Sequence, residues 1–278
     1  MQDAFVYCAE LVRAADRDRF IASLFAPAQR RGALHALYAF NAEVSRVREA
    51  AHAALPGEIR LQWWRDVIDG ERAEEANANP VAAALLATIE RHRLSSAKLI
   101  DLIEAHRFDL YEDTMADIAD LEAYASKTSS ALFALAAEIL TGVNAEAVST
   151  PAGIAFAIAG FLRAFPRHAA RGQLYVPVDL LDRHEVRLHD IFAGRSSAGL
   201  QAALAELRNL ARRHLFAAHK RMATLPRQAT PALLPVSLVR PALVRLERSD
   251  AFTPGEIPPW QRQWLIWCAA RNPARIAG

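Results

Sequence analysis

The chain has 278 residues, of which 53% are hydrophobic, and its formal net charge is +2. This small charge provides no bulk electrostatic basis for binding nucleic acid, so we expect no such partner. The two cysteines, Cys8 and Cys268, form no C-x-x-C motif, which argues against a disulfide framework and against a thiolate metal site. Alanine, leucine and arginine dominate while glycine is sparse, which favours an all-α fold.

Hydrophobic residues recur at helical spacing along most of the chain, and proline or glycine separates the periodic segments. Segment 71–79 is polar and is predicted to be a loop, and Pro56-Gly57 is predicted to break a helix. The connections are short and no domain boundary is visible, so we predict one helical bundle over residues 1–278. The predicted helices cover 3–17, 20–27, 28–54, 58–70, 81–92, 95–113, 118–140, a segment after Pro151 that ends or kinks near Pro166, a short piece before Gly194, 198–224, 231–246 and 258–270.

The N-terminal segment contains four acids and lacks the apolar core of a secretory signal. No apolar run approaches the length of a transmembrane helix. We therefore expect a cytoplasmic protein that is at most peripheral on a membrane.

Residues 153–177 change character from apolar to basic. Their first part has one wide apolar helical stripe, in which the small residues Ala157 and Gly160 would allow another helix or a ligand to approach closely. The basic residues that follow have no acid among them. The segment is either a core helix with a solvated basic end, which the general behaviour of charge runs favours, or a site for an anionic head with an apolar tail. The stripe consists of Ile154, Ile158, Phe161, Leu162 and Phe165, and the basic group of Arg163, Arg167, His168 and Arg171.

Arg163, Tyr175, Pro177, Asp179 and Leu180 give this region a resemblance to a known family. It resembles the second signature of the squalene/phytoene synthase family, a helix reading Q-x-x-N-x-x-R-D-x-x-x-D before a basic loop and Y-x-P. The resemblance implies an isoprenoid-synthase-type helical bundle. In such enzymes, acids hold Mg²⁺ against two prenyl diphosphates that are joined head to head. In this chain, the glutamine, the asparagine and the two aspartates of the signature are replaced by Ala157, Gly160, Ala164 and His168, respectively.

The sequence YAFNAEVSRVRE at 38–49 resembles the first signature of the same family, Y-A-x-x-R-x-x-D-D-x-x-D. Ala42 stands at the arginine position, Ser45 and Arg46 stand at the paired aspartates, and only the last acid is kept, as Glu49. Mg²⁺ takes oxygen ligands and usually needs one or two carboxylates. We therefore predict no catalytic residue, no metal and no cofactor, with Mg²⁺ expected only if the chain is an enzyme after all.

A relocated metal site would have to use other acids. Asp109 and Asp113 have the D-x-x-x-D spacing, which by itself is common on exposed helix faces. His35 and His52 flank the first signature, and neither has a partner at ligand spacing. We interpret both histidines as ordinary core or surface residues.

The substituted residues form motifs of their own. The stretches FNAE at 40–43 and LRAFPRH at 162–168 resemble a branch of the family that acts in the assembly of mitochondrial respiratory complex I, together with its bacterial relatives. The resemblance implies a non-catalytic protein, peripheral to the inner membrane, whose partner is a complex I subunit or assembly intermediate. Two alternatives stay open: a head-to-head prenyl diphosphate synthase with an unusual metal site, and a protein that holds a prenyl lipid without turnover.

The resemblance also implies which residues line the former active-site cavity. Glu43 or Glu49 is predicted to pair with Arg163 across this cavity, because buried charges must be paired. Alternatively, the basic residues at its far side bind a prenyl diphosphate or a lipid head group. The predicted cavity residues are Tyr38, Asn41, Glu43, Arg46, Glu49, Arg163, His168, Arg171 and Tyr175.

Trp260, Trp264 and Trp267 share one face of the predicted last helix. Aromatic stripes at helical spacing are usually core, so we expect this helix to close the bundle. The alternative is peripheral membrane contact or partner docking through the same face. Trp63 and Trp64 cannot both point inward, so one of them should be buried and the other half-exposed.

Overall fold

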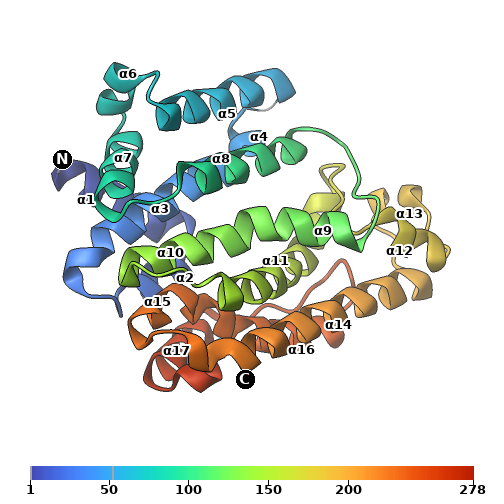
Figure 1. The fold of residues 1–278 in the computed structure, drawn as a ribbon. Helices are drawn as coiled ribbons and strands as arrows, with labels where there is room; N and C mark the ends of the chain where they lie inside the picture. Colours follow the sequence, from blue (N-terminus) through green and yellow to red (C-terminus); the bar gives the residue numbers. More distant parts are fainter. Residues whose placement is uncertain (1, 52) are drawn as a thin grey trace. The chain divides into compact units, whose positions relative to one another are not determined.

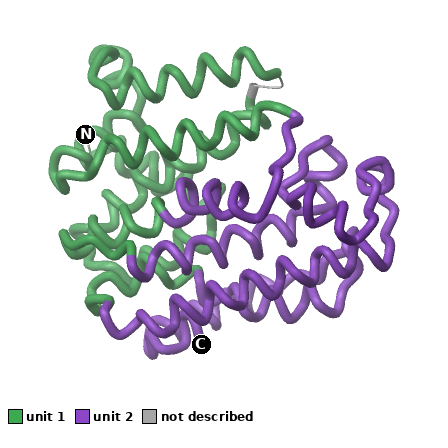
Figure 2. Tube along the Cα trace, turned by 45° about the vertical axis from the view of Figure 1, so that its right-hand side comes forward, with its two compact units in different colours: residues 1–111, 131–146, 225–235 green, residues 112–130, 147–224, 236–278 purple. Residues whose placement is uncertain are grey.

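The computed structural model describes residues 2–51 and 53–278, and it is helical almost throughout, which confirms the predicted all-α fold (Figure 1). An isolated parallel bridge joins Thr114 to Leu174. His52 lies outside the described residues. The chain forms two compact units that alternate along the sequence (Figure 2). The single domain over residues 1–278 stays a prediction.

Unit 1 consists of Met1–Tyr111, Ala131–Glu146 and Leu225–Pro235. Its centre is α3, which packs against α1, α7 and α10 and buries Leu34, Leu37 and Phe40 completely. Trp64 is also fully buried and meets Phe40 edge-on, with ring centroids 5.0 Å apart, whereas Trp63 is half-buried as predicted. The α-helices are α1 (Gln2–Ala15), α2 (Arg17–Ser23), α3 (Ala28–Ser45), α4 (Val47–Ala51), α5 (Ala54–Asp69), α6 (Ala73–Ala78), α7 (Pro80–His92), α8 (Ser96–Ala105), α10 (Ala131–Thr141) and α15 (Thr230–Leu233).

Unit 2 consists of Glu112–Ser130, Ala147–Thr224 and Val236–Gly278. The long helix α14 packs against α12 and α16 within it. The helices are α9 (Ile118–Ala125), α11 (Glu146–Ala169, which begins at the last residue of a unit 1 segment), α12 (Val178–Arg183), α13 (Leu188–Phe192), α14 (Ala198–Arg221), α16 (Val239–Glu247) and α17 (Pro259–Arg271).

Several predicted helix ends in unit 1 are wrong. The helix predicted over 28–54 ends at Ser45, and α4 follows Arg46 as a separate short helix. Pro56 does not break α5, because a proline in the first turn removes an N–H that has no intrahelical partner there. The predicted loop 71–79 contains α6, after which the Asn79 side chain accepts hydrogen bonds from the first backbone N–H groups of α7. The helix predicted over 95–113 ends at Ala105, and the 3-10 turn His106–Leu110 follows.

The helix predicted over 118–140 is interrupted in the structure by the π-helical segment Ser126–Ser130. There α11 comes very close: a Cβ built on Gly153 would lie 2.3 Å from the Cα of Ser130, and Ser130 Oγ donates to the Thr150 carbonyl at 2.8 Å. Gly153 therefore provides the close approach that was expected at Gly160, where an added Cβ would meet nothing within 4 Å.

Two further predicted helices have different bounds in the structure. Helix α11 begins at Glu146, before Pro151, whereas its end at Ala169, three residues after Pro166, agrees with the predicted end near that proline. The helix predicted over 231–246 is divided into α15, a 3-10 segment and α16.

Two helical stretches have the length and composition of a membrane span, which corrects the expectation that no segment approaches it. They are Glu146–Ala169 and Arg227–Glu247, and 67% and 72% of their most apolar windows are buried inside the protein. This burial is typical of core helices.

Candidate functional site

The first signature lies on α3, the turn at Arg46 and the start of α4, and its tyrosine is part of the core of unit 1. Tyr38 is 2% exposed, and the Arg19 guanidinium lies 5.8 Å from its ring centroid and 5.6 Å from that of Phe133. Burial raises the pKa of the Tyr38 hydroxyl far above its ordinary value. The ring therefore contributes packing and a cation–π contact rather than an ionisable group.

Glu43 forms an ion pair inside unit 1. Its carboxylate lies 3.5 Å from Nη2 of Arg60, on the neighbouring α5, and its side chain is 17% exposed. Burial raises the pKa of Glu43, and the positive charge and hydrogen bond of Arg60 oppose that rise. Arg60 satisfies this acid without a metal, a role that the sequence analysis did not assign to it.

Arg46, in the turn between α3 and α4, bonds to Glu49 on α4. Arg46 Nε donates to Glu49 Oε2 at 3.2 Å, and both side chains are exposed. Asn41 is half-buried one turn earlier. The acid kept from the signature thus lies beside a guanidinium, which would repel a dication.

Residues 2–51 and 53–278 hold no group of three or more His, Cys, Asp or Glu side chains that could bind a metal ion. Asp109 is buried and bonds to His106, with 2.6 Å between Nδ1 and Oδ2. Because the helical turn ends at Leu110, Asp109 and Asp113 do not have the one-face helical geometry that the D-x-x-x-D spacing suggested. His35 is a core residue, as one of the two interpretations has it, and it bonds to Ser23 Oγ at 2.7 Å.

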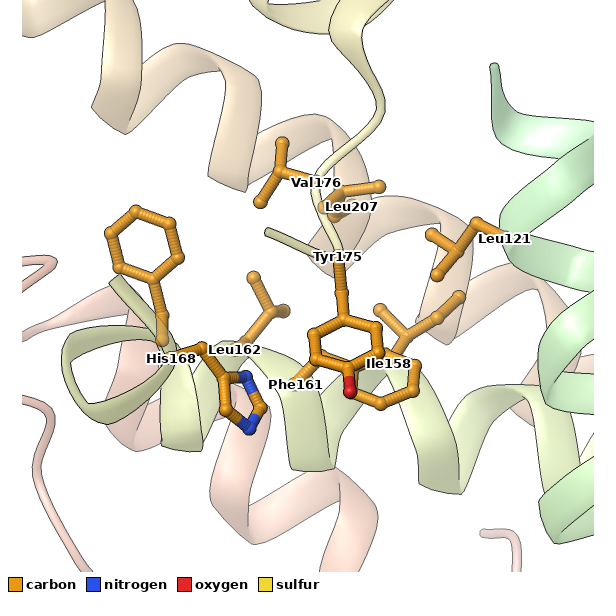
Figure 3. Close-up of a pocket in the computed structure, with 9 residues that line it drawn as sticks. Leu121, Ile158, Phe161, Leu162, His168, Tyr175, Val176 and Leu207 are labelled. Carbon is orange, nitrogen blue, oxygen red and sulfur yellow. The ribbon is translucent and has the colours of Figure 1, made fainter. Parts of the chain in front are cut away.

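The second signature lies in unit 2, where its aromatic residues form a cluster (Figure 3). The rings of Phe161 and Tyr175 stack in parallel, with centroids 4.4 Å apart. His168 lies 4.8 Å and Tyr124 5.7 Å from the Tyr175 ring, both tilted. The cavity beside them has a volume of about 10 Å³, which is close to the space of one water molecule.

The arginines at the end of α11 and just after it lie on the protein surface. Arg163, Arg167 and Arg171 are exposed, whereas Ile158, Leu162 and Phe165 of the same region are buried. This is the arrangement that the core-helix interpretation predicts.

The structure brings some predicted site residues together within each unit. His168 meets Tyr175 in unit 2, and Arg46 meets Glu49 in unit 1. Glu43 and Glu49 both have cationic partners in unit 1, so neither needs Arg163, and that pairing stays a prediction. Sequence reasoning missed Tyr124 in the aromatic cluster, because no spacing connects it to Tyr175.

Comparison with solved structures supports the architecture first. A dehydrosqualene synthase crystallised in complex with ligand matches with a TM-score of 0.83 at 16% identity, over 97% of this chain and 96% of that one. At this identity the match shows the fold, and it confirms the predicted isoprenoid-synthase-type helical fold.

The sequence pattern of the squalene/phytoene synthase family matches residues 12–267, and the chain belongs to this family. Among curated relatives, "NADH dehydrogenase (ubiquinone) complex I, assembly factor 6" of Rattus norvegicus is 29% identical over 250 residues, which are 89% of this chain and 75% of that protein. The Homo sapiens protein of the same name is 29% identical over 246 residues, covering 88% and 74%.

Proposed function

We propose that this protein acts without catalysis in the assembly of respiratory complex I, with a complex I subunit or assembly intermediate as its partner. The similarity to proteins named complex I assembly factor 6 supports the partner. The ion pair of Arg46 and Glu49 supports the absence of catalysis. Arg46 stands where the family signature has a metal-binding acid, and it bonds to Glu49, the one acid of the signature that is kept.

The chemistry of the site supports the same proposal. Mg²⁺ that holds a diphosphate keeps near-octahedral oxygen coordination and usually takes one or two protein carboxylates. The first signature offers Glu43 on α3 and Glu49 on α4, and an arginine forms an ion pair with each of them. In unit 2, the cavity that Phe161, His168 and Tyr175 help to line is about 10 Å³, which is too small to hold a prenyl chain. We therefore assign the protein no catalytic residue and no Mg²⁺ requirement.

A deletion strain complemented with full-length variants tests the proposal. The deletion should lower the amount of assembled complex I in membranes, measured by native electrophoresis with NADH dehydrogenase staining, and the wild-type chain should restore it. Glu49→Gln removes the last signature acid and should restore complex I equally well, because no metal depends on it. Ser45→Ala is the control for mutation within the same exposed turn, and the empty vector sets the baseline.

Two outcomes would contradict the proposal. Unchanged complex I in the deletion strain would remove the assembly role. Loss of complementation by Glu49→Gln, with Ser45→Ala active and both variants equally abundant, would indicate that the acid acts chemically.

A further inference from the structure

The tryptophans of α17 lie on the protein surface, which contradicts the expectation that they close the bundle. Trp260, Trp264 and Trp267 are 70%, 57% and 39% exposed. The opposite face of the helix provides its packing, through the buried Ile266 and Ala269. Helix α17, near the red end of the colour scale in Figure 1, is therefore apolar on both its inner and its outer side.

The exposed rings form an ordered stripe. Trp264 and Trp267 stack with centroids 5.0 Å apart, and the Arg271 guanidinium lies 4.5 Å from the Trp267 ring centroid. Stacked indoles beside a guanidinium combine apolar area with hydrogen-bond donors and positive charge. That combination suits the boundary between lipid head groups and acyl chains.

An arginine-lined groove lies next to this stripe. It has a volume of about 480 Å³, and α16 contributes Arg240 and Arg245 to it, with Arg248 directly after the helix. Gln261 of α17 also lines the groove and accepts a hydrogen bond from Arg245 Nη2 at 2.6 Å, which joins the groove to the tryptophan helix.

The charge of this region is positive. Segment 236–278 holds six arginines and three acids. Two of the acids make contacts with α14: Glu247 bonds to Arg212 at 2.5 Å, and Asp250 accepts from Gln201 at 3.3 Å. Glu256, the third, is exposed. An arginine-rich groove beside exposed indoles is complementary to a surface that is negatively charged and apolar beneath, as an anionic bilayer is.

We infer that α17 and the groove beside it form a docking surface for an anionic lipid bilayer, on which the tryptophans enter the head-group region and Arg240, Arg245, Arg248 and Arg271 contact lipid phosphates. The protein binds peripherally, because both span-length helical stretches are mostly buried in its core. This surface uses none of the residues on which the proposed assembly role depends. The membrane-binding inference and the assembly proposal can therefore be contradicted independently of each other.

Flotation of the full-length protein with lipid vesicles tests this inference. One vesicle type is phosphatidylcholine alone, and the other contains equal parts of phosphatidylcholine and phosphatidylglycerol. The wild type should float with the anionic vesicles, show a blue shift of tryptophan emission, and lose binding at high salt. The double variant Trp260→Ser/Trp264→Ser and the double variant Arg240→Gln/Arg248→Gln should each lower the partition coefficient by roughly tenfold or more, since each buried ring or basic residue near the surface contributes measurably.

Two control variants match these changes in unit 1. Leu55→Ser removes an apolar side chain that is 71% exposed, and Arg13→Gln/Arg91→Gln removes the same charge from exposed positions. Both should float as the wild type does, and thermal melts should show that all variants are folded.

Absence of wild-type binding to anionic vesicles, or equal flotation of the tryptophan variant and the wild type, would overturn the inference and leave the stripe as a protein-docking face. Equal binding to phosphatidylcholine alone would overturn the assignment of the arginines.

Discussion

Two groups of aromatic side chains in unit 2 have opposite environments. Around Tyr175, the rings of Phe161, His168 and Tyr124 pack against one another. Phe161, His168 and Tyr175 also line a cavity of about 10 Å³ (Figure 3). On α17, the stacked pair Trp264 and Trp267 is exposed. Both groups lie on or beside helices with regular apolar spacing, yet one stabilises the interior and the other faces solvent.

The difference shows what helical periodicity can and cannot predict. Periodicity identifies residues that share a face, but the neighbouring segments decide whether that face is covered. Tyr175 lies in the loop between α11 and α12 and stacks its ring on Phe161, whereas α17 buries only its opposite face, through Ile266 and Ala269. An aromatic stripe thus indicates either a core or a contact surface.

The largest expected effect is in the buried cluster. Tyr175→Ala removes a ring that is 8% exposed and stacked at 4.4 Å, so it should lower the free energy of unfolding by about 3 kcal/mol. Urea denaturation measures this loss. Tyr175→Phe keeps the ring and should cost at most about 1 kcal/mol. An unchanged midpoint for Tyr175→Ala would show that the cluster does not stabilise unit 2.

Two glycines of α11 provide a matched pair with opposite expected signs. Gly153→Ala places a Cβ 2.3 Å from the Ser130 backbone and should destabilise the protein by about 2 to 3 kcal/mol. Gly160→Ala enters open space and should stabilise the helix by roughly 0.5 to 1 kcal/mol. Thermal melting of both variants checks the prediction, and a stable Gly153→Ala protein would contradict the close contact.

His35 extends the comparison to a buried ring in unit 1, where it stacks on Phe20 with centroids 5.5 Å apart. Desolvation, with a smaller contribution from Arg31, lowers the pKa of His35 to about 4. The unfolded chain therefore binds a proton that the folded chain does not bind between that value and the ordinary pKa of about 6.5. Stability should be complete above this window and fall as the pH decreases through it, by about 2 kcal/mol between pH 7 and pH 5.

Urea denaturation at the two pH values measures the His35 effect. His35→Gln should remove most of the pH dependence in this window, although the pKa of His92 is also lowered by burial and leaves a smaller residual slope. Identical slopes for the variant and the wild type would assign the effect to other groups.

The smallest effect is expected on the exposed stripe. Trp264→Ala should change the free energy of unfolding by less than about 0.5 kcal/mol, because the ring is 57% exposed and surface substitutions are usually small. Urea denaturation of Trp264→Ala and Tyr175→Ala under the same conditions compares the two losses of unfolding free energy directly. A loss comparable to that of Tyr175→Ala would mean that α17 uses its tryptophans to stabilise unit 2.

The sequence predicted those parts of the fold that local chemistry determines. Helix α17 begins at Pro259, the second of two consecutive prolines, and Gly70 ends α5 in the left-handed conformation, with φ of 85°. Contacts with distant segments determined the rest. The π-helical segment lies where Gly153 brings another helix against Ser130, and no local pattern contains that information.

The candidate site was predictable to a similar degree. Alignment of motifs located Tyr38, Glu49 and Tyr175, but side-chain partners depend on packing between helices. Glu43 pairs with Arg60 on α5, a residue that lies outside both signatures. Periodicity also could not predict that the tryptophans of α17 are exposed, because it contains no information about which segments cover a helix face.

We propose that this member of the squalene/phytoene synthase family lacks the metal-dependent chemistry of a prenyl diphosphate synthase. Isothermal titration of the purified protein with farnesyl diphosphate, with and without Mg²⁺ and followed by product analysis, tests it most directly. We expect no Mg²⁺-dependent binding and no condensation product. Mg²⁺-dependent binding together with a head-to-head condensation product would contradict it.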